Sequence, residues 1–123
     1  MTLHSPIAYA RRETPARSLR SVEYDLIAQV TQRLRTAWTN RESDFPGMVR
    51  ALADNQKLWT TLASDVALPD NGLPQALRAR LFYLYEFTAN HSRAVLDKGA
   101  SIDVLTDINT AVMRGLRGDR GPG

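Results

Sequence analysis

The chain has 123 residues, of which 43% are hydrophobic and 24% are charged, a composition that predicts one globular domain with a single core. It contains no cysteine, which excludes disulfides and thiolate metal sites. The formal net charge of +3 is concentrated near the ends: residues 1–20 hold four arginines against one glutamate, and residues 112–123 hold three against one aspartate. The segment between them is slightly acidic, so no basic face is expected on the folded body and nucleic acid is not an expected partner.

The sequence predicts neither a membrane-spanning helix nor a signal peptide. No apolar run approaches the roughly 20 residues that a membrane-spanning helix needs, so membrane insertion is not expected. The N-terminal arginines are not followed by the apolar stretch of a signal peptide. Together with the lack of cysteine, these features lead us to expect a cytoplasmic protein.

Residues 1–17 contain two prolines and no lasting periodicity, and we interpret them as a flexible N-terminal arm. Ile7 and Tyr9 are apolar residues within it. The arm could be a free tail, or it could dock through Tyr9 on the domain or on a partner, and both alternatives stay open.

Helical spacing of apolar residues begins after this arm. It predicts a first helix from Leu19 to Thr39. A second helix is expected from Asp44, which can cap the helix two residues before Pro46, to about Ala67. The sequence LPDNG that follows is a strong helix breaker because it combines Pro, Asp, Asn and Gly.

The third expected helix, from Asn71 to Gly99, has both ends marked in the sequence. Asn71 can cap its start, Pro74 suits its first turn, and Gly99 suits a left-handed stop after Lys98. Its inward face is predicted from residues at helical spacing, namely Leu77, Leu81, Leu84, Tyr85, Thr88, Val95 and Leu96.

The apolar face of this third helix is unusually wide. Phe82 and Phe87 lie on its two flanks and Tyr83 lies beyond them, so that at 100° per residue the apolar arc covers roughly 220°. An ordinary surface helix has a stripe of about half that width. The helix is therefore either wrapped by the rest of its own domain or left partly open for a partner.

A fourth helix is expected from Ser101, as its cap, to Gly115, and residues 117–123 are expected to be disordered because they hold no core-forming side chain. The predicted fold class is all-α. We expect a small bundle of about four helices with short loops and antiparallel neighbours, forming a single helical domain over residues 18–116 between flexible termini.

No catalytic or metal-binding motif stands out. His4 and His91 are the two histidines, without an HExxH motif, and no glycine-rich loop precedes a lysine. His91 is interpreted as a surface or boundary residue. Asp103 and Asp107 are one helical turn apart, but their better explanation is that they meet the helix dipole and solvent. We therefore expect no enzymatic activity, no cofactor and no metal.

Recognition of a partner by helices is the function that the residues favour. Aromatic side chains are common binding anchors, methionine forms adaptable walls, and Arg or Asn can add polar contacts. The candidate partner-binding residues are Trp59, Arg78, Phe82, Tyr83, Phe87, Asn109 and Met113. Trp59 also fits a core position, in which case Trp59→Ala should lower stability by roughly 3–5 kcal/mol.

Four blocks of the sequence resemble the FlaF family, small flagellar-biosynthesis regulators of alphaproteobacteria. The blocks are AYARRETPARSLRSVEYDL, ALADNQKLWTTLASDVALPDNGLPQALRARLFYLYEF, HSRAVL and DINTAVMRGL, and they span nearly the whole chain apart from its last seven residues. The second block is the most specific one. Its residues at family-like spacing are Asn55, Leu58, Trp59, Asp65, Asn71, Leu73, Pro74, Leu77 and Arg78.

The resemblance implies a regulator of flagellum biosynthesis that acts as an export chaperone for flagellin, in a pathway with a FlbT-like regulator. The ends of flagellin are amphipathic helices, and a small helical domain with one over-wide apolar helix could cover such a segment. Two alternatives stay open. One is a post-transcriptional regulator whose arginine-rich ends contact flagellin mRNA directly, and the other is an obligate helical oligomer whose broad apolar face is its own interface.

Overall fold

The computed structural model describes residues 15–118, and it describes the side chains of residues 24–115. Within this range the chain forms four α-helices and no strand, which confirms the predicted all-α fold. The helices are α2 (Pro15–Thr39), α3 (Phe45–Ala67), α4 (Gln75–Lys98) and α5 (Asp103–Gly118).

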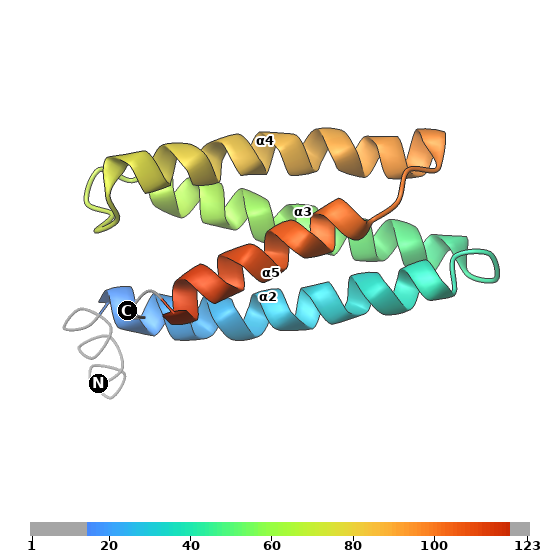
Figure 1. Cartoon of the computed structure of the whole chain (residues 1–123), viewed down its shortest axis with the longest axis horizontal. Helices are drawn as coiled ribbons and strands as arrows, with labels where there is room; N and C mark the ends of the chain where they lie inside the picture. Colours follow the sequence, from blue (N-terminus) through green and yellow to red (C-terminus); the bar gives the residue numbers. More distant parts are fainter. Residues whose placement is uncertain (1–14, 119–123) are drawn as a thin grey trace, which may run out of the picture.

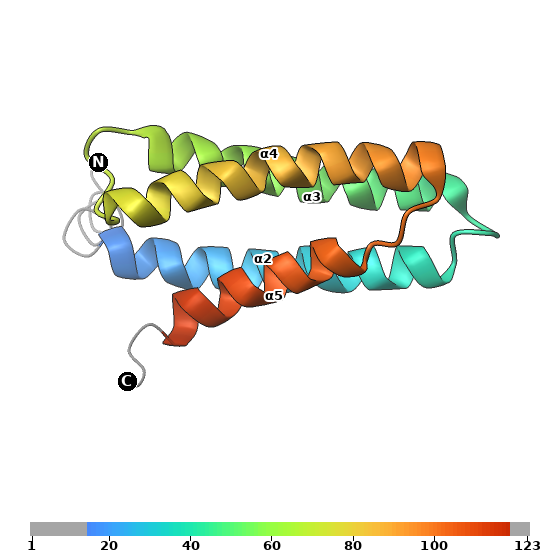
Figure 2. The ribbon, with the colours of Figure 1, turned by 45° about the horizontal axis from the view of Figure 1, so that its top comes forward.

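The four helices run alternately up and down the bundle (Figure 1). Helix α2 packs against α3 and α5, and α3 also packs against α4. The α4–α5 pair is the least closely associated of the neighbouring pairs. In both ribbon views, α5 starts near the end of α4 and then diverges from it toward its own C-terminus (Figures 1 and 2).

Three helix ends form as local sequence chemistry dictates. Asp44 caps α3, and its Oδ1 accepts a hydrogen bond from the backbone N–H of Gly47 at 3.0 Å. Helix α4 stops at Gly99, whose φ of 69° is the left-handed conformation that glycine adopts without a steric penalty. Ser101 Oγ accepts from the N–H of Asp103 at 3.0 Å and so caps the start of α5.

The predicted start of α4 is wrong. The helix begins at Gln75, its N-cap is Pro74, and no side chain caps it. Asn71 instead closes the loop between α3 and α4: its Nδ2 donates to the carbonyl of Asp65 at 3.0 Å, and its Oδ1 accepts from the N–H of Leu73 at 2.9 Å. An asparagine in a loop satisfies nearby backbone groups whether or not a helix starts there, and the sequence alone did not distinguish the two roles.

The outer helices extend beyond the bounds expected from the sequence. Helix α2 begins at Pro15, four residues before the expected start and inside the predicted arm. Helix α5 continues to Gly118, three residues past the expected end. The predictions for the remainder of the arm and of the C-terminal tail concern residues 1–14 and 119–123, which lie outside the described residues.

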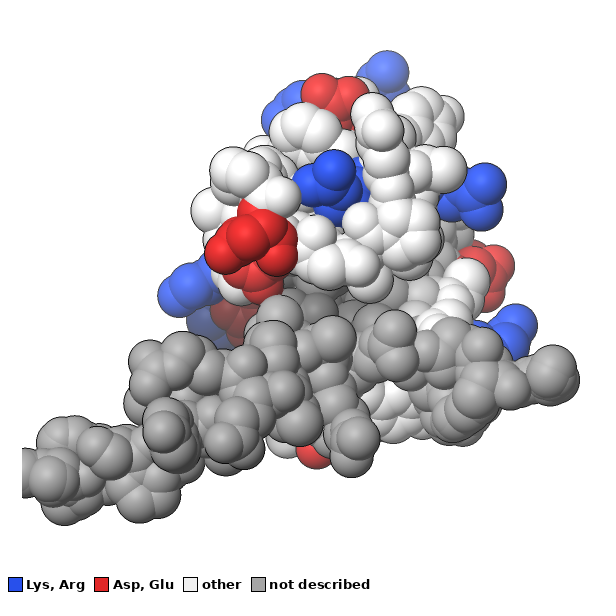
Figure 3. Space-filling model, turned by 90° about the vertical axis from the view of Figure 1, so that its left-hand side faces the viewer, with Lys and Arg blue, Asp and Glu red and all other residues white. Residues whose placement is uncertain are grey.

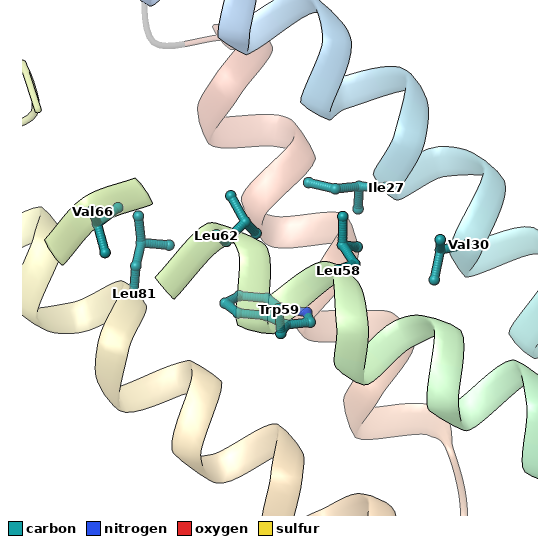
Figure 4. Packing of buried hydrophobic residues seen from close by; sticks show 7 residues of the cluster. All are labelled: Ile27, Val30, Leu58, Trp59, Leu62, Val66 and Leu81. Carbon is teal, nitrogen blue, oxygen red and sulfur yellow. The ribbon is translucent and has the colours of Figure 1, made fainter. Parts of the chain in front are cut away.

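The core consists of two apolar clusters along the bundle. In the first, Leu81 of α4 points toward Val66 of α3, and side chains of α2 complete the group (Figure 4). Its buried members are Ile27, Val30, Leu58, Trp59, Leu62, Val66 and Leu81. The second cluster comprises Leu34, Met48, Ala51, Leu52, Val95, Ile102 and Leu105.

A central polar layer separates these clusters. We define it as Thr31, Asn55, Thr88 and Asn109, one residue from each helix, each at most 1% exposed. In α2, α3 and α4, the layer residue lies along the chain between members of the two clusters. Buried polar groups are tolerated only with hydrogen-bond partners, so this layer restricts how the helices can be aligned.

The hydrogen bonds of the layer centre on Asn109. Its Oδ1 accepts from the indole Nε1 of Trp59 at 2.9 Å, and its Nδ2 donates to Thr31 Oγ1 at 3.0 Å and to Asn55 Oδ1 at 2.8 Å. Because an indole nitrogen can only donate, this bond sets the orientation of the Asn109 amide, which in turn sets that of Asn55. The Nδ2 of Asn55 is buried without a partner among the described residues.

Helix α4 lies outside this hydrogen-bonded network. Thr88 Oγ1 donates to the carbonyl of Tyr85, and Ser92 Oγ donates to the carbonyl of Thr88, both at 2.7 Å and both within α4. The network thus ties α2, α3 and α5 together.

Replacing Asn109 by leucine should destabilise the fold by roughly 2–4 kcal/mol, because it leaves the Trp59 indole N–H and the Asn55 carbonyl oxygen buried and unpaired. Urea unfolding followed by circular dichroism measures this. Asn90→Ala on the exposed side of α4 is the matched control and should stay within about 0.5 kcal/mol of wild type. Equal stability of the two variants would contradict the role given to the network.

Two glycine-to-alanine substitutions should change the stability of the fold in opposite directions. No atom lies within 4 Å of the added Cβ at either Gly99 or Gly115, so only backbone conformation differs. Gly99→Ala should destabilise by about 1–2 kcal/mol because alanine is strained in the left-handed region. Gly115→Ala, inside α5, should stabilise by about 0.5–1 kcal/mol because alanine favours the helix. Thermal unfolding of both variants tests this pair.

Candidate functional site

The inward face of α4 is narrower than the sequence predicts. Leu77 and Leu96, both expected on that face, are 39% and 37% exposed. They lie in the first and last turns of the helix. The buried residues of α4 are Leu81, Thr88, Ser92 and Val95. Leu84 and Tyr85 are partly buried against the first cluster, whereas Phe82 and Tyr83, on the outer part of the arc, are not used in the core.

Two large aromatic side chains of α4 point away from the core. Phe82 is 46% exposed and Tyr83 is 65% exposed. Neither belongs to the buried clusters, which are complete without them. Exposed aromatic side chains with no role in the core are typical of contact surfaces.

Phe82 is held in place at the surface. Its ring stacks on that of Tyr85, with centroids 5.7 Å apart and ring planes inclined by 14°. Tyr85 is partly buried and packs against the first cluster. The core therefore restrains Phe82 through Tyr85, which lowers the conformational entropy that a partner's binding would have to remove.

Phe87 takes part in a second stack and is half-buried. Its ring lies 5.8 Å from that of His91, with an angle of 15° between the planes. His91 Nε2 lies 2.7 Å from the carbonyl oxygen of Ser101. Because a carbonyl only accepts, Nε2 carries the proton. His91 thus joins α4 to the connection before α5, which agrees with the expected boundary position.

The three aromatic residues form a band around α4 and not one cluster. Phe82 and Phe87 are five residues apart, which places them about 140° apart around the helix axis, with Tyr83 between them. Tyr83 and Phe87 are one turn apart on the same side. A partner must therefore cover the outer side of α4 to touch all three.

Two predicted partner-binding residues lie inside the bundle. Trp59 is 1% exposed and Asn109 is completely buried, and they are hydrogen-bonded to each other. Any effect of these two residues on a partner is therefore indirect in the closed bundle. Met113 of α5 is half-buried against the first cluster.

Arg78 caps the C-terminal end of α3. Its Nη1 donates to the carbonyls of Val66 and Leu68, at 3.4 and 3.3 Å. A cation is favourable there because the helix dipole leaves partial negative charge on the last carbonyls. The sequence suggested a polar contact for Arg78 but gave no sign of this contact with α3.

Two exposed apolar residues were not anticipated as surface positions. Leu68, at the C-cap of α3, is 52% exposed, and Phe45, at the opposite end of α3, is 53% exposed. Leu68 is the first residue of the helix-breaking sequence LPDNG, and α3 does end before it, but its exposure was not predicted. Phe45 fits the helical period and carries no such signal.

Other kinds of site find no support in the described part of the chain. Residues 24–115 contain no group of three or more His, Cys, Asp or Glu side chains placed to hold a metal ion. None of the described helices is both long and apolar enough to cross a membrane. The exposed aromatic residues of α4, Phe82 and Tyr83, are the strongest candidate for a functional surface.

Comparison with known protein families agrees with the sequence blocks noted above. The family model described as "Flagellar protein FlaF" matches residues 5–116 of the chain. The chain belongs to the FlaF family. No curated protein and no solved structure matches it. Family membership assigns this FlaF-family protein a flagellar role, and the match covers the whole helical bundle up to residue 116.

Replacement by alanine should affect stability differently at the buried Trp59 and at the exposed Tyr83. Trp59→Ala should lower the free energy of unfolding by roughly 3–5 kcal/mol, because it opens a cavity in the core and leaves the Asn109 carbonyl oxygen unpaired. Tyr83→Ala should change it by no more than about 0.5 kcal/mol, because the side chain is mostly exposed. Chemical unfolding of both variants measures the difference. A large loss in Tyr83→Ala would show that this ring belongs to the folding core.

Proposed function

We propose that this FlaF-family protein is a flagellin-binding chaperone and regulator of flagellum biosynthesis, which sequesters an amphipathic helical segment of flagellin in the cytoplasm. The observation that carries the proposal is the pair of exposed aromatic residues on α4, Phe82 and Tyr83, in a bundle whose core is complete without them. Family membership supplies the flagellar context.

The proposed binding mode is packing of a client helix on the outer side of α4. An amphipathic helix has an apolar stripe that needs covering, and aromatic side chains supply large contact areas at low entropic cost. Phe82 would be the more rigid anchor because it stacks on Tyr85. Tyr83, together with the half-buried Phe87 one turn later, would extend the contact around the helix.

The client could bind there without disturbing the central polar layer. Among the described side chains, the hydrogen bonds that join the helices at that layer do not include α4, and Phe82 and Tyr83 face outward. Covering this face removes apolar surface from water, at about 25 cal/mol per Å² before the entropic terms that oppose association.

The test is isothermal titration calorimetry with flagellin and with separate peptides that cover its two terminal helical segments. The double variant Phe82→Ala/Tyr83→Ala should bind at least about tenfold more weakly, because central aromatic residues commonly carry 2 kcal/mol or more of binding energy. The matched control is Phe45→Ala, which removes an equally exposed aromatic ring from the far end of α3 and should leave the affinity unchanged.

The outcomes separate the proposal from its alternatives. No binding of flagellin by the folded wild-type protein would contradict the proposal itself. Equal losses in the Phe45 control and the double variant would contradict the assignment of the surface. Binding of an RNA oligonucleotide that weakens steeply with salt would favour contact with mRNA phosphates over apolar helix capture. Light scattering that shows a stable oligomer, unchanged by flagellin, would favour a self-association interface.

A further inference from the structure

Arg78 is a partly buried cation without a counter-ion among the described residues. The pairing partners of its guanidinium there are two backbone carbonyls, those of Val66 and Leu68, at 3.4 and 3.3 Å. Both distances are longer than the usual 2.7–3.2 Å of an N–H···O bond. Its Nε is buried and has no partner in the described part of the chain. The guanidinium has five N–H donors, so this contact leaves most of its bonding capacity unused.

Arg78 makes no ion pair with an acidic side chain of the described residues. Asp65 and Asp70 are the acidic residues closest in sequence on the α3 side, and neither makes an ion pair with Arg78. The first turn of α4 contains no acidic residue. Figure 3 views the molecule from the end where α4 begins and shows both basic and acidic atoms there, separated by uncharged ones. A charge taken partly out of water without a counter-ion is unfavourable.

Exposed apolar side chains border Arg78. Leu68, whose carbonyl contacts the guanidinium, is 52% exposed. Phe82 lies one helical turn after Arg78 on α4 and is 46% exposed. Arg78, Leu68 and Phe82 together form what we call the Arg78 corner, a cation with one exposed apolar residue at the end of α3 and another one helical turn away on α4.

From this arrangement we propose that the Arg78 corner binds a carboxylate of the client, an Asp or Glu side chain that sits beside the apolar stripe of its amphipathic helix. This inference rests on the proposed function and specifies the chemistry of its partner. The carboxylate accepts from the free N–H groups of the guanidinium in the planar geometry that arginine favours, while the apolar stripe covers Leu68 and Phe82. Charge complementarity then fixes the orientation of the client on α4.

The experiment is a double-mutant cycle measured by calorimetry. The protein carries Arg78→Gln, which removes the charge but keeps a donor for the α3 carbonyls, or Arg78→Lys, which keeps the charge but loses the planar fork. The client peptides are the terminal segments of flagellin, with each Asp changed to Asn and each Glu to Gln in turn. The matched control is Arg80→Gln, which neutralises an exposed arginine two residues further along α4.

We expect one client carboxylate whose neutralisation weakens binding to the wild-type protein about tenfold and has no effect on binding to Arg78→Gln. Arg78→Lys should retain part of the affinity, and Arg80→Gln all of it. The inference is overturned if Arg78→Gln binds every peptide as the wild type does, or if no carboxylate couples to it. The same holds if Arg78→Gln only lowers the unfolding midpoint without changing affinity, which would make Arg78 a structural cap alone.

The failure of this inference is distinguishable from that of the proposed function. If peptides bind equally well to the wild type and to the Arg78 variants, the proposed chaperone function is retained and only the carboxylate contact is excluded. If the folded wild-type protein binds neither flagellin nor its peptides, both the proposed function and the carboxylate contact are excluded. If the protein binds no peptide, and Arg78→Gln loses affinity for an RNA oligonucleotide, the unpaired guanidinium binds phosphate. That result would overturn the proposal that a client helix binds at the Arg78 corner.

Discussion

The alignment of this bundle depends on one buried amide. Asn109 accepts a hydrogen bond from Trp59 and donates to Thr31 and Asn55, so that a single side chain joins α2, α3 and α5. The apolar clusters on either side could tolerate a shift of one helical turn, because one aliphatic residue resembles another at such positions. The polar layer could not, because a shift would leave several buried donors and acceptors unpaired. Even the observed alignment leaves Asn55 Nδ2 without a described partner.

Helix α4 is positioned by its packing against α3 and takes no part in this network. Its hydroxyl groups inside the bundle bond to its own backbone, and its buried face consists of four residues. Helix α5 is held to α2 and α3 through Asn109 and diverges from α4 (Figure 2). The apolar side chains on the outer part of α4 therefore have no neighbouring helix to cover them. The same alignment that completes the core leaves the aromatic band exposed.

The proposed flagellar role draws on both features. A chaperone must hold an apolar helix and later release it, which a surface of a few anchors serves better than an extensive buried interface. A rigid base is equally necessary, because anchors that are already ordered lose less entropy on binding. Tyr85 gives Phe82 such a base. Apolar contacts alone do little to fix the orientation of a bound helix. A carboxylate contact at Arg78 would fix that orientation.

Local sequence chemistry was sufficient for the existence of the four helices, the Asp44 and Ser101 caps and the left-handed stop at Gly99, because each depends on residues within one turn. The FlaF resemblance was likewise readable from the sequence blocks. Periodicity gives the angle of a residue around its helix axis but not which helix covers that angle. Only the tertiary structure therefore decided that Trp59 and Asn109 are internal, that Leu77 and Leu96 are exposed, and that Asn71 closes a loop.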